Sequence, residues 1–64
     1  MSNLVERIHY FVAELEVERT KLKAKSADAH IEMQTRMAYG NRAHQLRQMA
    51  LRLRKMAEEF SDAN

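Results

Sequence analysis

The chain has 64 residues and lacks several residue types: it contains no cysteine, no proline and no tryptophan, and it has one glycine. Without cysteine no disulfide can form, and a structural metal site loses its commonest ligand. Without proline, and with a single glycine, few positions are suited to ending a helix. The composition therefore predicts an all-α protein.

Long apolar runs are also missing. No stretch approaches the roughly 20 residues that a membrane span needs, and the first residues lack the basic, apolar and small-residue succession of a signal peptide. We therefore expect no membrane association and a cytoplasmic location. A single domain of 64 residues is close to the size at which one chain struggles to bury enough apolar surface. Oligomerisation is the usual remedy that remains.

The only glycine lies in the stretch Tyr39-Gly40-Asn41. Glycine adopts the left-handed conformation that ends a helix, and asparagine is a good N-cap for the next helix. We therefore predict that residues 1–64 form a single helical-hairpin domain with one long and one short helix. The predicted elements are a helix over about 3–39, a turn at 40–41, a helix over about 42–60 and a frayed tail at 61–64.

Capping signals refine this prediction at two places. Asn3 followed by Glu6 resembles a capping box and predicts that the first helix begins near Leu4. Farther along, Ser26 and Asp28 resemble the start of a new helix. A break near Ser26, which would give three helices, is the main alternative architecture.

Each predicted helix has one apolar face with helical spacing. In the first helix the large members of this face are Leu4, Val5, Ile8, Phe11, Val12 and Leu15. In the second helix the face comprises Ala43, Leu46, Met49, Ala50, Leu53, Met56, Ala57 and Phe60. Alanine recurs there at every seventh position, which lets a facing helix approach closely.

The predicted lengths leave part of the first helix uncovered. A helix over 42–60 is about 28 Å long, whereas one over 4–39 is about 54 Å long. The short arm would reach back only to about Arg19, so the apolar face at the start of the chain needs another partner. We therefore predict a homodimer, a four-helix coiled-coil-like bundle, whose interface is formed by Leu4, Val5, Ile8, Phe11, Val12 and Leu15.

No residue pattern supports catalysis or metal binding. No two of His9, His30 and His44 lie at the spacing that directs two side chains of a helix to one metal, and there is no cysteine. No serine has a histidine and an acid placed to activate it, and there is no glycine-rich phosphate loop. We therefore predict a protein that is not an enzyme, with no cofactor and no metal.

Charge is distributed unevenly along the chain. Between Met33 and Met56 there is no acidic residue, whereas the first twenty residues are mildly acidic. A basic segment of this kind indicates a solvated face, a surface for an acidic protein or a surface for nucleic acid. Leu51 lies within the basic face, and an apolar centre ringed by arginine favours a protein partner.

The sequence therefore predicts a small protein-binding module, an adaptor, co-chaperone or inhibitor of a larger protein, that acts as a homodimer. The predicted partner-binding residues are Arg47, Leu51, Arg52, Arg54 and Lys55. Tyr10 and Val17 form a second candidate protein surface on the other side of the first helix. The main alternative is a dimeric regulator that binds RNA or DNA with the arginine-rich face of its second helix. A purely structural oligomerisation element is the third possibility.

Overall fold

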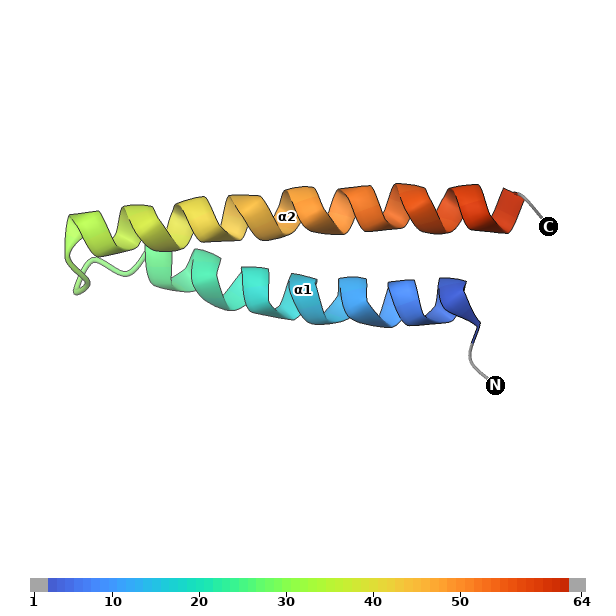
Figure 1. Ribbon diagram of the computed structural model, residues 1–64. Helices are drawn as coiled ribbons and strands as arrows, with labels where there is room; N and C mark the ends of the chain where they lie inside the picture. Colours follow the sequence, from blue (N-terminus) through green and yellow to red (C-terminus); the bar gives the residue numbers. More distant parts are fainter. Residues whose placement is uncertain (1–2, 63–64) are drawn as a thin grey trace.

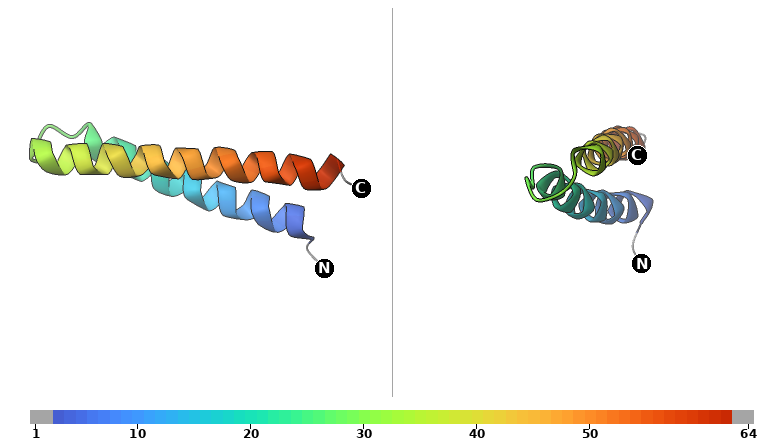
Figure 2. Two further views of the ribbon diagram at one scale, coloured as in Figure 1. Left: turned by 45° about the horizontal axis from the view of Figure 1, so that its top comes forward. Right: turned by 90° about the vertical axis from the view of Figure 1, so that its left-hand side faces the viewer.

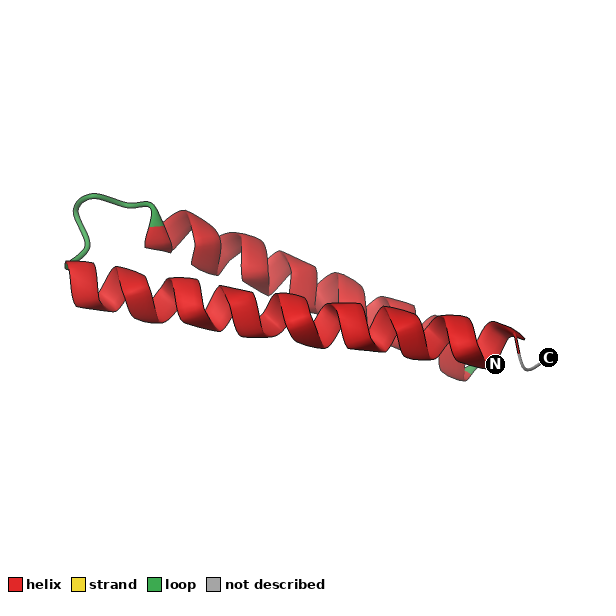
Figure 3. Cartoon of the chain, turned by 90° about the horizontal axis from the view of Figure 1, so that it is seen from above, coloured by secondary structure: helices red, strands yellow, loops and turns green. Residues whose placement is uncertain are grey.

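Two antiparallel helices make up residues 3–62, the part of the chain that this computed structural model describes (Figure 1). Helix α1 covers Leu4–Ser26, helix α2 covers Met33–Asp62, and residues 27–32 form the loop between them. The start of α1 and the end of α2 lie together at the open end of the molecule, and the loop forms its closed end (Figure 3). The hairpin measures 49 × 19 × 10 Å. The predicted all-α helical hairpin is confirmed.

Helix α1 begins where its capping signal predicts. Asn3 is extended (φ −83°, ψ 174°), and its Oδ1 accepts a hydrogen bond from the backbone N–H of Glu6 at 2.8 Å. This contact satisfies one of the N–H groups that have no partner within the first turn. Lys23 and Lys25 lie in the last turn, where positive charge interacts favourably with the helix dipole.

The loop at 27–32 reverses the chain without glycine or proline. At its start, Ser26 Oγ donates a hydrogen bond to the carbonyl of Lys23 at 2.7 Å. Within the loop, the Asp28 carboxylate accepts one from the backbone N–H of His30 at 2.9 Å. Such local side-chain contacts offer the backbone an alternative to continuing the helix. Serine and aspartate therefore end α1 here, although alanine and lysine surround them.

The turn predicted at 40–41 is wrong. Gly40 lies inside α2, and its φ is not positive. The alternative break near Ser26 has the right place, but it gives two helices rather than three. At the closed end Gly40 faces α1, and a Cβ added to it would lie 3.8 Å from the Cβ of Ser26.

The position of the loop also reverses the predicted lengths. Helix α1 has 23 residues and α2 has 30, so the second helix is the longer one. These lengths correspond to about 35 Å and 45 Å, and α2 therefore extends along the whole of α1. The premise that residues 4–15 lack a partner within their own chain is wrong. The predicted tail at 61–64 is helical as far as Asp62, and residues 63–64 lie outside the described part.

A narrow seam of small and branched side chains joins the two helices, which cross at an oblique angle (Figure 2). The buried apolar residues come from both helices: Ile8, Val12, Ala43, Leu46, Ala50 and Ala57. Val5, Leu15 and Leu53 pack against them and are half-buried. All three heptad-spaced alanines are buried, as packing of a facing helix along this edge requires.

Candidate interaction surfaces

The seam divides the surface of the hairpin into two flanks. Along each helix, the positions that face the partner helix recur three and four residues apart, as Ile8 and Val12 do on α1 and Leu46 and Ala50 do on α2. Phe11 and Met49, which directly precede Val12 and Ala50, lie on one flank. Arg47, which directly follows Leu46, lies on the other flank. Because the helices are antiparallel, equivalent positions of α1 and α2 share a flank.

One flank, called the apolar flank below, carries large apolar side chains from both helices. Its members are Leu4, Phe11, Met49, Met56 and Phe60, and each residue is between 41% and 55% exposed. Phe11, Met49 and Met56 each directly precede a buried position. At the open end, Leu4 and Phe60 help to line a hollow of about 210 Å³. The result is one apolar surface that the chain itself leaves uncovered.

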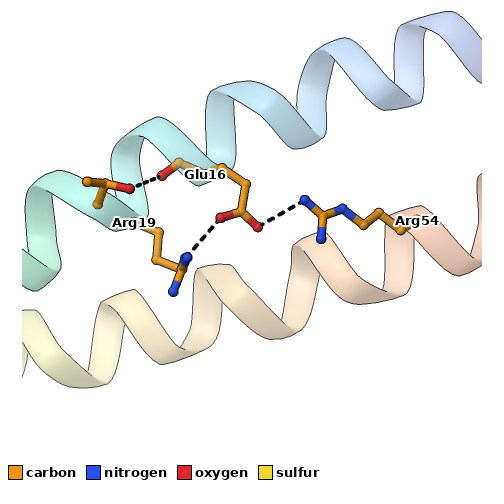
Figure 4. A network of polar contacts seen from close by, with 4 residues as sticks. Glu16, Arg19 and Arg54 are labelled. Carbon is orange, nitrogen blue, oxygen red and sulfur yellow. Dashed lines mark hydrogen bonds and ion pairs between the residues drawn. The ribbon is translucent and has the colours of Figure 1, made fainter.

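The opposite flank, called the polar flank below, is marked by an ion-pair network (Figure 4). Glu16 Oε2 accepts a hydrogen bond from Arg19 Nε at 3.0 Å, and Glu16 Oε1 lies 3.5 Å from Arg54 Nη2 of α2. Thr20 Oγ1 donates to the Glu16 carbonyl at 2.9 Å. Partly exposed ion pairs of this kind contribute about 0–1 kcal/mol each. The pair between Glu16 and Arg54 joins the two helices, and it favours the register in which Arg54 faces α1.

A row of exposed residues, called the basic stripe below, follows the outer side of α2 next to the polar flank. It consists of Arg47, Leu51, Arg54 and Lys55, which recur at spacings that share one helical face. Leu51 is 45% exposed at its centre. Arg52 is exposed farther round the helix, beside Lys55. Four of the five residues predicted to bind a partner therefore lie together, and the fifth lies at their edge.

The six residues predicted for a dimer interface are divided by the structure. Ile8 and Val12 are buried against α2 of their own chain, and two more of the six are half-buried in the same seam. Only Leu4 and Phe11 remain largely exposed. The predicted interface therefore belongs mainly to the core of the hairpin.

Sequence reasoning missed the part of the apolar flank that α2 provides. The sequence pattern places Met49, Met56 and Phe60 on the apolar face of the second helix, yet all three are more than 40% exposed. A signal was present: Met49 and Met56 are seven residues apart, each one position before an alanine of the seam. It becomes meaningful only when the alignment of the two helices is known.

Tyr10 and Val17, the second candidate surface, lie on the outer side of α1, away from α2. They are 71% and 56% exposed. Single exposed apolar residues are common on soluble proteins and need no partner. These two lie apart from the apolar flank and the basic stripe, and they form a smaller surface than either.

Within residues 3–62, no three histidine, cysteine, aspartate or glutamate side chains lie together as a metal site requires. Of the helices described, neither α1 nor α2 combines the length and the apolar character needed to cross a membrane. Comparison of the chain with protein-family models, curated proteins and solved structures yields no match.

Proposed function

We propose that this chain is a non-enzymatic protein-binding module, which pairs with a second copy of itself through the apolar flank and presents the basic stripe to an acidic protein. One observation carries the proposal: five large apolar side chains from two helices form one exposed surface on one side of the seam. Surfaces of this kind mark sites of protein interaction.

The size of the apolar flank supports this function. Taking about 200 Å² for a fully exposed side chain of this size, five residues that are 41–55% exposed present roughly 450 Å². A stable interface buries about 800 Å² on each partner. The apolar flank alone therefore supplies more than half of the area that a dimer needs.

The core within one hairpin is thin. Three of its six buried apolar residues are alanines. Burial of a side chain such as Ile8 or Val12 contributes about 1.5–3 kcal/mol, whereas ordering the backbone costs about 1–2 kcal/mol for each residue. A second hairpin over the apolar flank would add Phe11, Met49 and Met56 to a shared core of four helices.

A second copy of the chain fits the apolar flank because twofold pairing places an apolar surface against the same apolar surface. Two charged residues of this flank, Lys25 and Arg42, lie towards the closed end, and Glu18 lies about level with Met49. Overlap of the two open-end halves buries the apolar side chains and leaves Lys25 and Arg42 outside. The pairing is therefore an antiparallel overlap of the open-end halves, with the two closed ends pointing away from each other.

This pairing leaves the basic stripe free, because it lies on the other side of the seam. An exposed leucine surrounded by Arg47, Arg54 and Lys55 resembles a protein-binding hot spot, in which an apolar anchor is ringed by polar groups. A surface that tracks phosphates has no need of such an anchor. Leu51 therefore favours an acidic protein over nucleic acid as the partner.

Sedimentation velocity over a range of concentrations tests self-association. The wild-type chain should sediment as a dimer, and Met56→Glu should shift it to monomer, because a carboxylate would be buried in the interface. Val17→Glu is the matched control, since the residue has similar exposure on the outer side of α1, and it should leave the dimer intact. A monomeric wild type, or equal effects of the two variants, would contradict the proposed pairing.

Fluorescence anisotropy tests the basic stripe. The probes are an acidic amphipathic helical peptide, duplex DNA and hairpin RNA, each labelled and titrated at low and near-physiological salt. Leu51→Ser should weaken peptide binding about tenfold or more and leave binding of the nucleic acids unchanged. If DNA or RNA binds more tightly than the peptide, with steep salt dependence and no effect of Leu51→Ser, the nucleic-acid function replaces the protein-binding one.

A further inference from the structure

A second hollow lies on the polar flank near the closed end, across the seam from the apolar flank. It has a volume of about 260 Å³. Its floor is made of Ser26, Gly40 and Ala43, whose small side chains leave room between the helices. Ser26 Cβ is the nearest atom to the place that a Cβ of Gly40 would take, at 3.8 Å. Two helices that pack through small residues at this point thus create the hollow.

Four basic side chains surround this floor. Arg19 and Lys23 come from α1, and His44 and Arg47 come from α2. The described residues that line the hollow include no aspartate or glutamate. The Glu16 carboxylate pairs with Arg19, one of these four residues, and with an arginine of α2. No ion pair among residues 3–62 involves Lys23 or Arg47.

These side chains offer the donors that an oxyanion needs. Lys23 and Arg47 carry like charges with no ion-pair partner among residues 3–62, and an anion between them would relieve their repulsion. Arginine presents a planar fork of N–H groups that matches the oxygens of phosphate, lysine adds a compact charge, and the imidazole of histidine adds an N–H donor. Donors from both helices would thus converge on one ligand.

We propose that this hollow, called the anion pocket below, binds a phosphate or diphosphate group through Arg19, Lys23, His44 and Arg47. Its volume accommodates a group of that size, and its open side leaves room for the remainder of a larger ligand. Because the pocket and the apolar flank lie on opposite sides of the seam, one copy can bind the anion and a second copy at the same time. Binding should also hold the closed end of the two helices together.

Titration with sodium pyrophosphate, followed by ¹H–¹⁵N correlation spectra of the full chain, tests the pocket. Saturable shifts should be concentrated at residues 19–26 and 40–47, and sodium chloride of equal ionic strength should not produce them. Lys23→Gln and Arg47→Gln should each weaken binding about tenfold. Arg42→Gln is the matched control, since it removes the same charge from α2 on the other flank, and it should change affinity less than twofold.

A parallel titration with ADP distinguishes two sources of the same diphosphate group. Tighter binding of ADP than of pyrophosphate, with the same loss in Arg47→Gln, would identify a nucleotide as the ligand, and equal affinities would identify the free anion. The proposal is overturned if the shifts grow linearly with ionic strength for every salt. It is also overturned if Arg42→Gln weakens binding as much as Arg47→Gln, because the attraction would then be diffuse.

Discussion

Replacing Gly40 with alanine should stabilise this protein. Gly40 lies well inside α2, and its φ is not positive. In a helix interior glycine is about 1 kcal/mol less favourable than alanine. The added Cβ would meet its nearest neighbour, the Cβ of Ser26, at 3.8 Å, which is an ordinary van der Waals contact. The full gain of about 1 kcal/mol is therefore expected, and it should raise the Tm by about 4–8 °C in a chain of this size.

Thermal and urea unfolding monitored by circular dichroism, at one fixed protein concentration, measure this effect. Ala38→Gly is the matched control: the residue is exposed two positions earlier in α2, and the change should lower stability by about 1 kcal/mol. A loss of stability in Gly40→Ala would contradict the placement of Gly40 inside a helix. In a left-handed turn, alanine is less favourable than glycine by roughly 1–2 kcal/mol. A fall in Tm for Gly40→Ala would therefore indicate that the chain reverses at residues 40–41.

Three further changes test the seam, the cap and the ion pairs. Ile8→Val should lower the free energy of unfolding by about 0.5–1.5 kcal/mol in urea titrations, whereas Tyr10→Ala should change it by less than about 0.5 kcal/mol; equal losses would mean that Ile8 is not in the core. Asn3→Ala should destabilise the chain by about 1 kcal/mol because the first turn loses its cap, and Asn3→Asp should restore it. Glu16→Gln should lower the free energy of unfolding by up to about 1 kcal/mol at low salt and by less at about 1 M salt. An equal loss at both salt concentrations would show that the ion pairs with Arg19 and Arg54 make no electrostatic contribution.

Local patterns in the sequence predict several features correctly. Helical spacing of apolar residues predicts two amphipathic helices, and the pair Asn3 and Glu6 predicts the start of the first. The recurrence of Ala43, Ala50 and Ala57 predicts three small residues that are buried in the hairpin. Each of these features depends on residues within one or two turns of each other, and such patterns are visible in the sequence alone.

The position of the reversal could not be found in the same way. A turn at Gly40 has the stronger local signal, worth about 1 kcal/mol in backbone preference. A loop at 27–32 instead lets α2 run beside all of α1, so that Ile8 and Val12 become buried. Each of these contributes about 1.5–3 kcal/mol on burial, so the two together outweigh the preference of one glycine. The comparison requires both helices at once, and local capping rules do not contain it.

The two interaction surfaces follow from the same alignment. Met49 and Met56 belong to the apolar face of their helix, and only the register against α1 shows that they lie on a flank rather than in the seam. Phe60 continues the spacing of the seam and is exposed at the open end, where α1 begins. The anion pocket likewise depends on the alignment, because residues of both α1 and α2 line it. A turn at 40–41 would pair these residues in a different register. Exposure of Leu51 within the basic face, in contrast, depends on one helix alone, and here the prediction from the sequence agrees with the structure.

Isotope-filtered nuclear Overhauser spectra test the central claim, that a second copy covers the apolar flank. The sample is an equal mixture of ¹³C-labelled and unlabelled wild-type chain, so that only contacts between copies are detected. The proposed pairing predicts contacts from the methyl groups of Met49 and Met56 to the ring protons of Phe11 and Phe60 of the other copy, and none from Val17. The protein concentration should lie well above the dissociation constant of the dimer measured by sedimentation. If these contacts are absent under that condition, or if Val17 makes contacts instead, the proposed pairing is contradicted.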